Sequence, residues 1–258
     1  LEWTKLVKKY TLSKILYRLL GFALLLGIWQ IASTLIKQGS FILPNLKDTF
    51  AYTVKILNSS YLYNCILISL KNLLIGFVSA FICAFIIGVI AGNNRAFKEI
   101  IAPLVVTMKS IPTASVVYLF MLLAGIENSP IFIVALVCFP IIYEAIVSGI
   151  ENIDSTLIDA AKVDGISYLS GNTYIKVPLA IPSIILGISS CFGLGFKIEI
   201  MAEIITGSAK LGLGSAIASS QRSDPTNLVP VFAYSLIAIL LMFVIDLITS
   251  FVKDKIEG

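Results

Sequence analysis

The chain has 258 residues, of which 58% are hydrophobic and only 13% are charged. A soluble globular protein carries about 25% charged residues, so these charges are too few to cover the surface of a water-soluble fold. There is no histidine, which excludes Ser–His triads, histidine acid–base catalysis and imidazole metal ligands. The composition indicates an integral membrane protein and argues against an enzyme.

Other function classes are disfavoured by what the sequence lacks. The net charge of +4 comes from basic residues scattered through short loops, which argues against nucleic-acid binding. No GxxxxGK[ST] phosphate loop is present, so we expect no ATP, metal or other cofactor on this chain. The cysteines have neither metal-site nor redox spacing, and we expect four small lipid-facing or core-facing residues: Cys65, Cys83, Cys138 and Cys191.

Six stretches are apolar enough, or nearly so, to cross a membrane as helices of about 20 residues. In chain order they lie at about 19–36, 73–91, 100–126, 130–150, 177–206 and 228–252. We expect a kink at Pro112 in the third and snorkelling by Lys71 at one end of the second. The prediction is an all-α membrane protein with one six-helix domain over 15–252, a basic segment over 1–14 and a tail over 253–258.

Basic residues predict the orientation, because they gather in cytoplasmic loops. With the N-terminus inside, eleven basic residues fall on the cytoplasmic side and five on the other: Lys37, Lys47, Lys55, Lys210 and Arg222. We therefore expect both termini in the cytoplasm. This makes 151–176 the longest cytoplasmic loop.

This loop has the pattern of a short amphipathic helix. Asp154 or Ser155 can cap it, Gly165 can end it, and a second short segment follows from Ile166. Its apolar side chains need cover from either a protein partner or lipid headgroups, and the residues alone leave both open: Leu157, Ile158, Ala161, Val163 and Tyr168.

The same loop carries a family motif. Asp159-Ala160-Ala161-Lys162-Val163-Asp164-Gly165, nine further residues and Ile175-Lys176-Val177-Pro178 resemble EAA-x3-G-x9-I-x-L-P of ABC importer permeases. Asp replaces the first Glu and Val replaces Leu. In that family the loop forms a coupling helix that docks on a cytosolic ATPase. The resemblance implies docking by eleven residues: Leu157, Ile158, Asp159, Ala160, Ala161, Lys162, Asp164, Gly165, Ile166, Tyr168 and Pro178.

Shorter segments are similar to the nitrate, sulfonate, taurine and thiamine-precursor branch: Lys109-Ser110-Ile111-Pro112, Ala202-Glu203, Gly212-Leu213-Gly214 and Asp246. The resemblance implies a type I ABC importer permease in the bacterial inner membrane. Its implied partners are a second copy, two ATPase subunits that bind ATP and Mg, and an external solute-binding protein. The expected solute is small and polar, such as a sulfonate, with a thiamine-precursor pyrimidine as the alternative. A channel or secondary transporter without an ATPase is the rival class.

Charged residues inside the expected spans are candidates for the translocation pathway, because an ionised group within the bilayer is costly unless it is paired or meets water. Glu199 and Glu203 share a helix face, whereas Lys197 points elsewhere. These three residues line the pathway or lie at the outer headgroups. Lys109 beside Pro112 faces a cavity or snorkels to the inner surface. Two other acids are expected to be structural partners of backbone or basic groups: Glu144 and Asp246.

Overall fold

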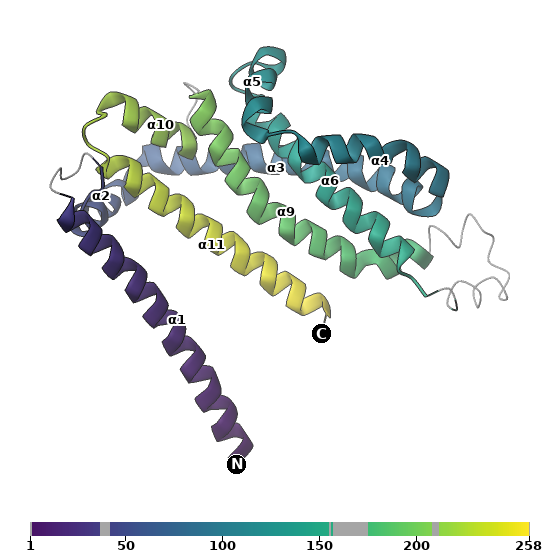
Figure 1. The fold of residues 1–258 in the computed structure, drawn as a ribbon, viewed down its shortest axis with the longest axis horizontal. Coiled ribbons are helices and arrows are strands. Elements are labelled where there is room, and N and C mark those ends of the chain that lie inside the picture. Colours follow the sequence, from purple (N-terminus) through teal and green to yellow (C-terminus); the bar gives the residue numbers. More distant parts are fainter. Residues whose placement is uncertain (1, 37–41, 155, 157–174, 208–211, 258) are drawn as a thin grey trace.

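The computed structural model describes residues 2–36, 42–154, 156, 175–207 and 212–257, and its regular structure there is helical (Figure 1). The helices are α1 (Glu2–Leu35), α2 (Leu46–Leu57), α3 (Ser60–Asn93), α4 (Arg95–Ser110), α5 (Thr113–Ala124), α6 (Ser129–Glu151), α9 (Val177–Thr206), α10 (Leu213–Ser223) and α11 (Val229–Glu257).

Four of the helices in the described ranges are long and apolar enough to cross a membrane: α3, α6, α9 and the Val229–Phe251 part of α11. The pair α4 and α5 passes the same test when taken together, and Leu20–Leu35 of α1 is a shorter apolar helix. The chain is thus an all-helical membrane protein with four or five such spans. The expected count of six stays a prediction.

The third expected span is broken rather than kinked, because α4 and α5 meet at 101°. Pro112 has no N–H to donate, and its ring disfavours helical geometry in the residue before it. Accordingly Ile111 is extended, with φ −71° and ψ 129°, and a new helix starts after the proline.

The second expected span is longer than predicted, because α3 begins at Ser60 instead of near residue 73. Ser59 caps the helix, its side chain accepting the backbone N–H of Tyr61 at 3.2 Å. Lys71 is therefore the twelfth residue of α3 and not close to the end of the helix, and the expectation that it snorkels stays a prediction.

The helices α3 and α6 run parallel in close contact. A Cβ atom at Gly76 would lie 2.8 Å from the Cβ of Val134, and one at Gly92 would lie 2.9 Å from the Cβ of Ile150. Residue numbers thus rise together along both helices. We call the end where α3 meets α4 the Lys98 end, and the opposite end, where α10 lies, the α10 end (Figure 1).

The bent pair α4–α5 returns the chain from the Lys98 end to the α10 end. Lys98 pairs with Glu151, the last residue of α6, and the Phe120 and Phe132 rings stack 5.6 Å apart near the start of α6. The helix α4 therefore runs antiparallel to the C-terminal half of α6, and α5, after the bend, contacts α6 near its start.

Small residues form the antiparallel crossing of α6 and α9, as is common between membrane helices. A Cβ atom at Gly187 would overlap the Cβ of Ala145, so only glycine permits this approach. Cys138 and Cys191 meet at the same crossing, where each thiol donates to the other residue's carbonyl, at 3.8 and 3.6 Å. Both are buried, as is Cys65, whereas Cys83 is exposed.

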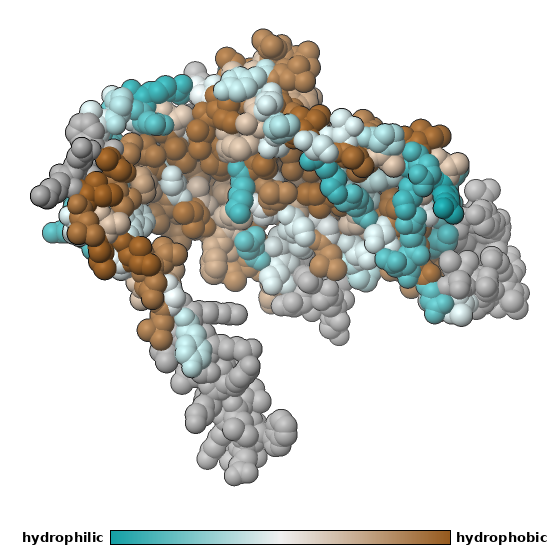
Figure 2. Space-filling view, in the orientation of Figure 1, coloured by the Kyte–Doolittle hydropathy of each residue, from teal (hydrophilic) through white to brown (hydrophobic). Residues whose placement is uncertain are grey.

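The helix α1 stands away from this bundle over most of its length (Figure 1). Its contacts lie near its C-terminal end, where the Trp29 indole donates to the Pro44 carbonyl at 3.0 Å and its ring lies 5.5 Å from that of Phe232. Figure 2 shows an apolar surface over much of the visible face, with hydrophilic side chains over α10 and toward the Lys98 end.

Candidate functional site

The two carboxylates of α9 lie inside the protein. Glu199 is 0% exposed and Glu203 is 2% exposed, whereas Lys197 is exposed. The four-residue spacing places the acids on one helix face and the lysine on another, as the sequence predicted. The protein thus encloses both carboxylates almost completely in this structure.

Glu203 joins three helices through hydrogen bonds to one oxygen. Its Oε2 accepts the Ser69 hydroxyl of α3 at 2.8 Å and the Gly214 N–H of α10 at 2.8 Å. Ser69 in turn accepts the Leu213 N–H at 2.8 Å. We call Ser69, Asn72, Glu199, Glu203 and Gly214 the carboxylate cluster.

The Gly212-Leu213-Gly214 segment reaches this cluster because its two glycines have no side chain in the way. A Cβ atom at Gly212 would overlap the Glu203 carboxylate, and one at Gly214 would overlap the Ile200 carbonyl oxygen. The structure therefore brings together two of the segments that the sequence singled out separately, Ala202-Glu203 and 212–214.

Glu199 is less well satisfied than Glu203. The Asn72 amide donates to its Oε1 at 3.5 Å, and its buried Oε2 has no hydrogen-bond partner within the described ranges. The ion pairs found in those ranges involve neither carboxylate. Hydrogen bonds thus stabilise this buried acidic cluster, and an ionised carboxylate in it would be costly.

A pocket of about 380 Å³ lies beside the cluster at the α10 end. Its wall includes Glu203, whereas Lys197 and Glu199 do not line it. The other polar lining residues come from α3, from α10 and from the segment before α6: Lys71, Asn72, Glu127, Asn128 and Ser215.

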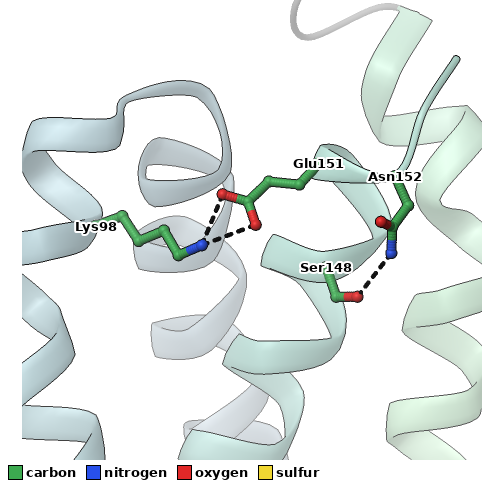
Figure 3. A network of polar contacts seen from close by, with 4 residues as sticks. All are labelled: Lys98, Ser148, Glu151 and Asn152. Carbon is green, nitrogen blue, oxygen red and sulfur yellow. Dashed lines mark hydrogen bonds and ion pairs between the residues drawn. The ribbon is translucent and has the colours of Figure 1, made fainter.

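Two ion pairs join α4 to α6. The Lys109 ammonium lies 2.8 Å from both carboxylate oxygens of Glu144, and the Lys98 ammonium lies 2.7 and 2.8 Å from those of Glu151. Figure 3 shows the second pair next to the Ser148–Asn152 hydrogen bond. The prediction that Glu144 partners a basic group is confirmed.

Between these ion pairs lies a second pocket of about 310 Å³, lined in part by Tyr143. The Tyr143 hydroxyl is buried and has no hydrogen-bond partner in the described part of the chain. Sequence reasoning missed this residue, because a tyrosine in an apolar run carries no signal of its environment.

Comparison with known proteins shows which family the chain belongs to. The model of the "binding-protein-dependent transport system inner membrane component" matches residues 84–258. The chain belongs to this family. A probable ABC transporter permease of Brucella melitensis is 31% identical over 204 residues, which cover 79% of this chain and 81% of that protein.

Two further relatives agree with this membership. A putative aliphatic sulfonates transport permease of Bacillus subtilis is 26% identical over 206 residues, covering 80% of this chain and 74% of that protein. An inward-facing structure of the MetNI methionine ABC transporter matches with a TM-score of 0.66 and 15% identity, covering 76% of this chain and 96% of that one. The chain is therefore a non-catalytic permease component of an ABC transporter, located in the inner membrane.

Most of the permease's expected docking residues lie outside the described residues: Leu157, Ile158, Asp159, Ala160, Ala161, Lys162, Asp164, Gly165, Ile166 and Tyr168. The eleventh, Pro178, stands in the first turn of α9, where a missing N–H costs little. Near the start of the loop, the Thr156 N–H donates to Asp154 Oδ1 at 2.9 Å, and this bond lowers the pKa of Asp154.

The remaining sequence candidates have defined places. Pro112 is the residue from which α5 starts, at the 101° bend. Asp246 of α11 packs against α9, where a Cβ atom at Gly193 would lie 2.8 Å from its Oδ1. Lys109 lies in the last turn of α4 and pairs with Glu144, a residue that lines the second pocket.

Proposed function

We propose that this permease forms the translocation pathway of an ATP-driven importer for a small polar solute, such as a sulfonate, delivered by an external binding protein. The observation that carries the proposal is the family match over residues 84–258, which includes the loop with the EAA-like motif. The Bacillus subtilis relative, named for aliphatic sulfonates, supports the solute class. A thiamine-precursor pyrimidine is the alternative solute.

The proposed assembly contains two copies of this chain and two ATPase subunits, which bind the ATP and Mg. Each copy crosses the membrane six times, with both termini in the cytoplasm. Leu20–Leu35 of α1 supplies the first crossing and the bent pair α4–α5 the third. The apolar side chains that α1 exposes then meet lipid or the second copy.

Coupling follows from the position of the loop between α6 and α9. Closure of the ATPase pair would move residues 157–168, which are joined directly to both helices. Because α6 and α9 interlock through small residues such as Gly187, they move as one body. Glu203 lies 26 residues beyond Val177, about 39 Å along α9, so motion at the loop reaches the carboxylate cluster.

The proposed pathway uses Glu203 and Glu199 at the α10 end, with Lys197 on the exposed face of α9. In the half of the molecule toward the Lys98 end, the proposed pathway passes Lys109 and the bend at Pro112. Glu203 has the strongest support among these residues, because its carboxyl group is part of the wall of a pocket.

Co-purification tests the ATPase partnership. We expect a tagged chain, co-expressed with ABC ATPase subunits of its own organism, to capture them. Gly165→Trp or Ala161→Trp should abolish capture, because a bulky side chain keeps the coupling helix from the groove of its partner. Ser223→Trp, at the α10 end, is the control and should capture normally.

The opposite results would reject the proposal. Equal capture by the Gly165 and Ala161 variants would remove the docking role of the loop. Solute flux through liposomes that contain this chain alone, without ATPase or ATP, would favour the channel or secondary transporter instead.

A further inference from the structure

Both stems of the proposed docking loop are attached to the turn between α3 and α4. The chain enters the loop after Glu151, the last residue of α6, and leaves it at Lys176, just before α9. The Lys98 ammonium donates to both carboxylate oxygens of Glu151 at 2.7 and 2.8 Å (Figure 3). The Lys176 ammonium donates to Asn93 Oδ1 at 3.1 Å. We call Asn93, Asn94 and Lys98 the α3–α4 corner.

The α3–α4 corner is itself fixed by hydrogen bonds. Asn94 is extended, with φ −134° and ψ 104°, and its side chain accepts the Phe97 N–H at 3.1 Å, which caps α4. The Asn93 amide nitrogen donates to the Val89 carbonyl at 2.9 Å, so its amide oxygen is the atom left for Lys176. The corner therefore presents a capped helix start and an oriented amide oxygen to the loop stems.

The stems also pack closely against their neighbours. A Cβ atom at Gly92, beside the corner, would lie 2.9 Å from the Cβ of Ile150 on α6. A Cβ atom at Gly149 on α6 would lie 2.9 Å from the Cβ of Ser183 on α9. Close-packed interiors have low compressibility and transmit strain. Displacement of a loop stem is therefore passed on to the corner and to α4.

The helix α4 leads from the corner to the bend at Pro112. It has 16 residues, which correspond to a length of about 24 Å. At its far end it is attached to α6 a second time, through the Lys109–Glu144 pair. It thus connects the loop stems with two residues of the proposed pathway, Lys109 and Pro112, without passing through α9.

We propose that the α3–α4 corner is a positioning element for ATPase coupling, which holds both stems of the docking loop and passes their displacement through α4 to the bend at Pro112. This proposal rests on the proposed function and adds a second route beside that through α6 and α9. Partly exposed ion pairs contribute little to folding stability, and the Lys98 and Glu151 side chains are 35% and 42% exposed. Removal of the pair should therefore alter the position of the stem and leave the fold and the docking surface intact.

Two cysteine reporters separate the two routes. The permease, assembled with its ATPase subunits in lipid nanodiscs, carries Cys83→Ala, which removes the exposed native thiol. Ser110→Cys reports at the end of α4, and Ser190→Cys reports on α9. Both serines are exposed and donate to the carbonyl four residues earlier, so the reporters are matched. The measurement is the change in the rate of modification by a methanethiosulfonate reagent when ATP and vanadate trap the ATPase pair in its closed state.

We expect Lys98→Met to reduce the ATP-dependent change at Ser110→Cys by about two- to five-fold, the factor that corresponds to loss of a partly exposed ion pair. The ATP-dependent change at Ser190→Cys and the capture of the ATPase should be unaltered. Combining Lys98→Glu with Glu151→Lys should restore the response at Ser110→Cys, because the pair forms again with its charges exchanged.

Two further variants complete the test. Lys176→Met releases the second stem and should also reduce the response at Ser110→Cys, because the hydrogen bond to Asn93 is lost. Lys55→Met, on α2, removes another exposed lysine and should change neither the response nor the capture.

Four results would overturn the positioning role: no ATP-dependent change at Ser110→Cys in the otherwise unaltered chain, an undiminished change in the Lys98→Met chain, an equal loss at Ser190→Cys, or no restoration by the exchanged pair. A complex that captures its ATPase and gives one of these results keeps the proposed function and loses the positioning role. Failed capture by the unaltered chain rejects the proposed function, and the positioning role is rejected with it.

Discussion

At the scale of single residues, the two acids of α9 differ in how well the protein satisfies them. Glu203 accepts hydrogen bonds from two helices at 2.8 Å, whereas Glu199 accepts one amide at 3.5 Å. A hydrogen bond to a charged group contributes more to protein stability than a hydrogen bond between neutral groups. A buried donor left without its acceptor is destabilising. The two positions should therefore respond differently to the same substitution.

We predict that Glu203→Gln lowers the stability of the permease by about 1–3 kcal/mol, because a neutral amide oxygen in the place of Oε2 accepts the Gly214 and Ser69 hydrogen bonds more weakly than a carboxylate oxygen does. Glu199→Gln should have a smaller effect. Thermal unfolding of the two variants in the same detergent measures the difference. Equal melting temperatures would contradict the prediction, and normal uptake by a stable Glu203→Gln chain would remove Glu203 from the pathway.

At the scale of elements, the stiffness of the α6–α9 pair depends on close backbone approach. The contact between Gly187 and Ala145 leaves no room for a further methyl group. Overpacking of this kind forces backbone shifts. By contrast, a Cβ atom at Gly27 in α1 would meet nothing within 4 Å.

Gly187→Ala should destabilise the permease by about 1–3 kcal/mol, because the added methyl group separates α6 from α9. Gly27→Ala is the matched control, with an expected effect between zero and a gain of about 1 kcal/mol from better helix propensity. Thermal unfolding compares both with the unaltered chain. A Gly187→Ala chain as stable as the control would show that the crossing can relax.

The sequence predicts the features of these helices that depend on local composition, and it does not predict those that depend on packing against other helices. Apolar length located four long helices, because burial in lipid requires about 20 apolar residues whatever the neighbours are. It missed the first thirteen residues of α3, since polar residues such as Asn64 and Lys71 interrupt the apolar run. Pro112 marked a break, but the angle of 101° depends on packing that no local pattern records.

The site was predictable to a similar degree. Spacing placed Glu199 and Glu203 on one helix face, and resemblance selected the 212–214 segment. Their meeting through Ser69 joins positions 134 residues apart, which one sequence cannot reveal. The Lys109–Glu144 pair likewise depends on the packing of α4 on α6.

At the scale of the whole molecule, the order of the helices fixes which ends lie together. Lys98, Glu151 and Lys176 share one end, where Lys176 donates to the Asn93 side chain at 3.1 Å. The loop between α10 and α11, at 224–228, belongs to the opposite end. The basic-residue bias then predicts that the Lys98 end lies on the cytoplasmic side.

Reporter fusions test this assignment. Green fluorescent protein fused after Gly258 should be fluorescent, because it folds in the cytoplasm, and alkaline phosphatase fused after Asp224 should be active, because it needs an oxidising compartment. Exchanging the two reporters is the control and should silence both. A fluorescent fusion at Asp224 would invert the orientation, and with it the side on which the pocket lies.

The broken helix α4–α5 also has a consequence for biogenesis. During synthesis, Lys109 enters the membrane region 35 residues before its partner Glu144 is made. An unpaired lysine near the middle of an inserting segment costs about 2.5–3.5 kcal/mol. Emergence of α6 supplies the partner carboxylate, so we expect the presence of α6 to favour insertion of this segment.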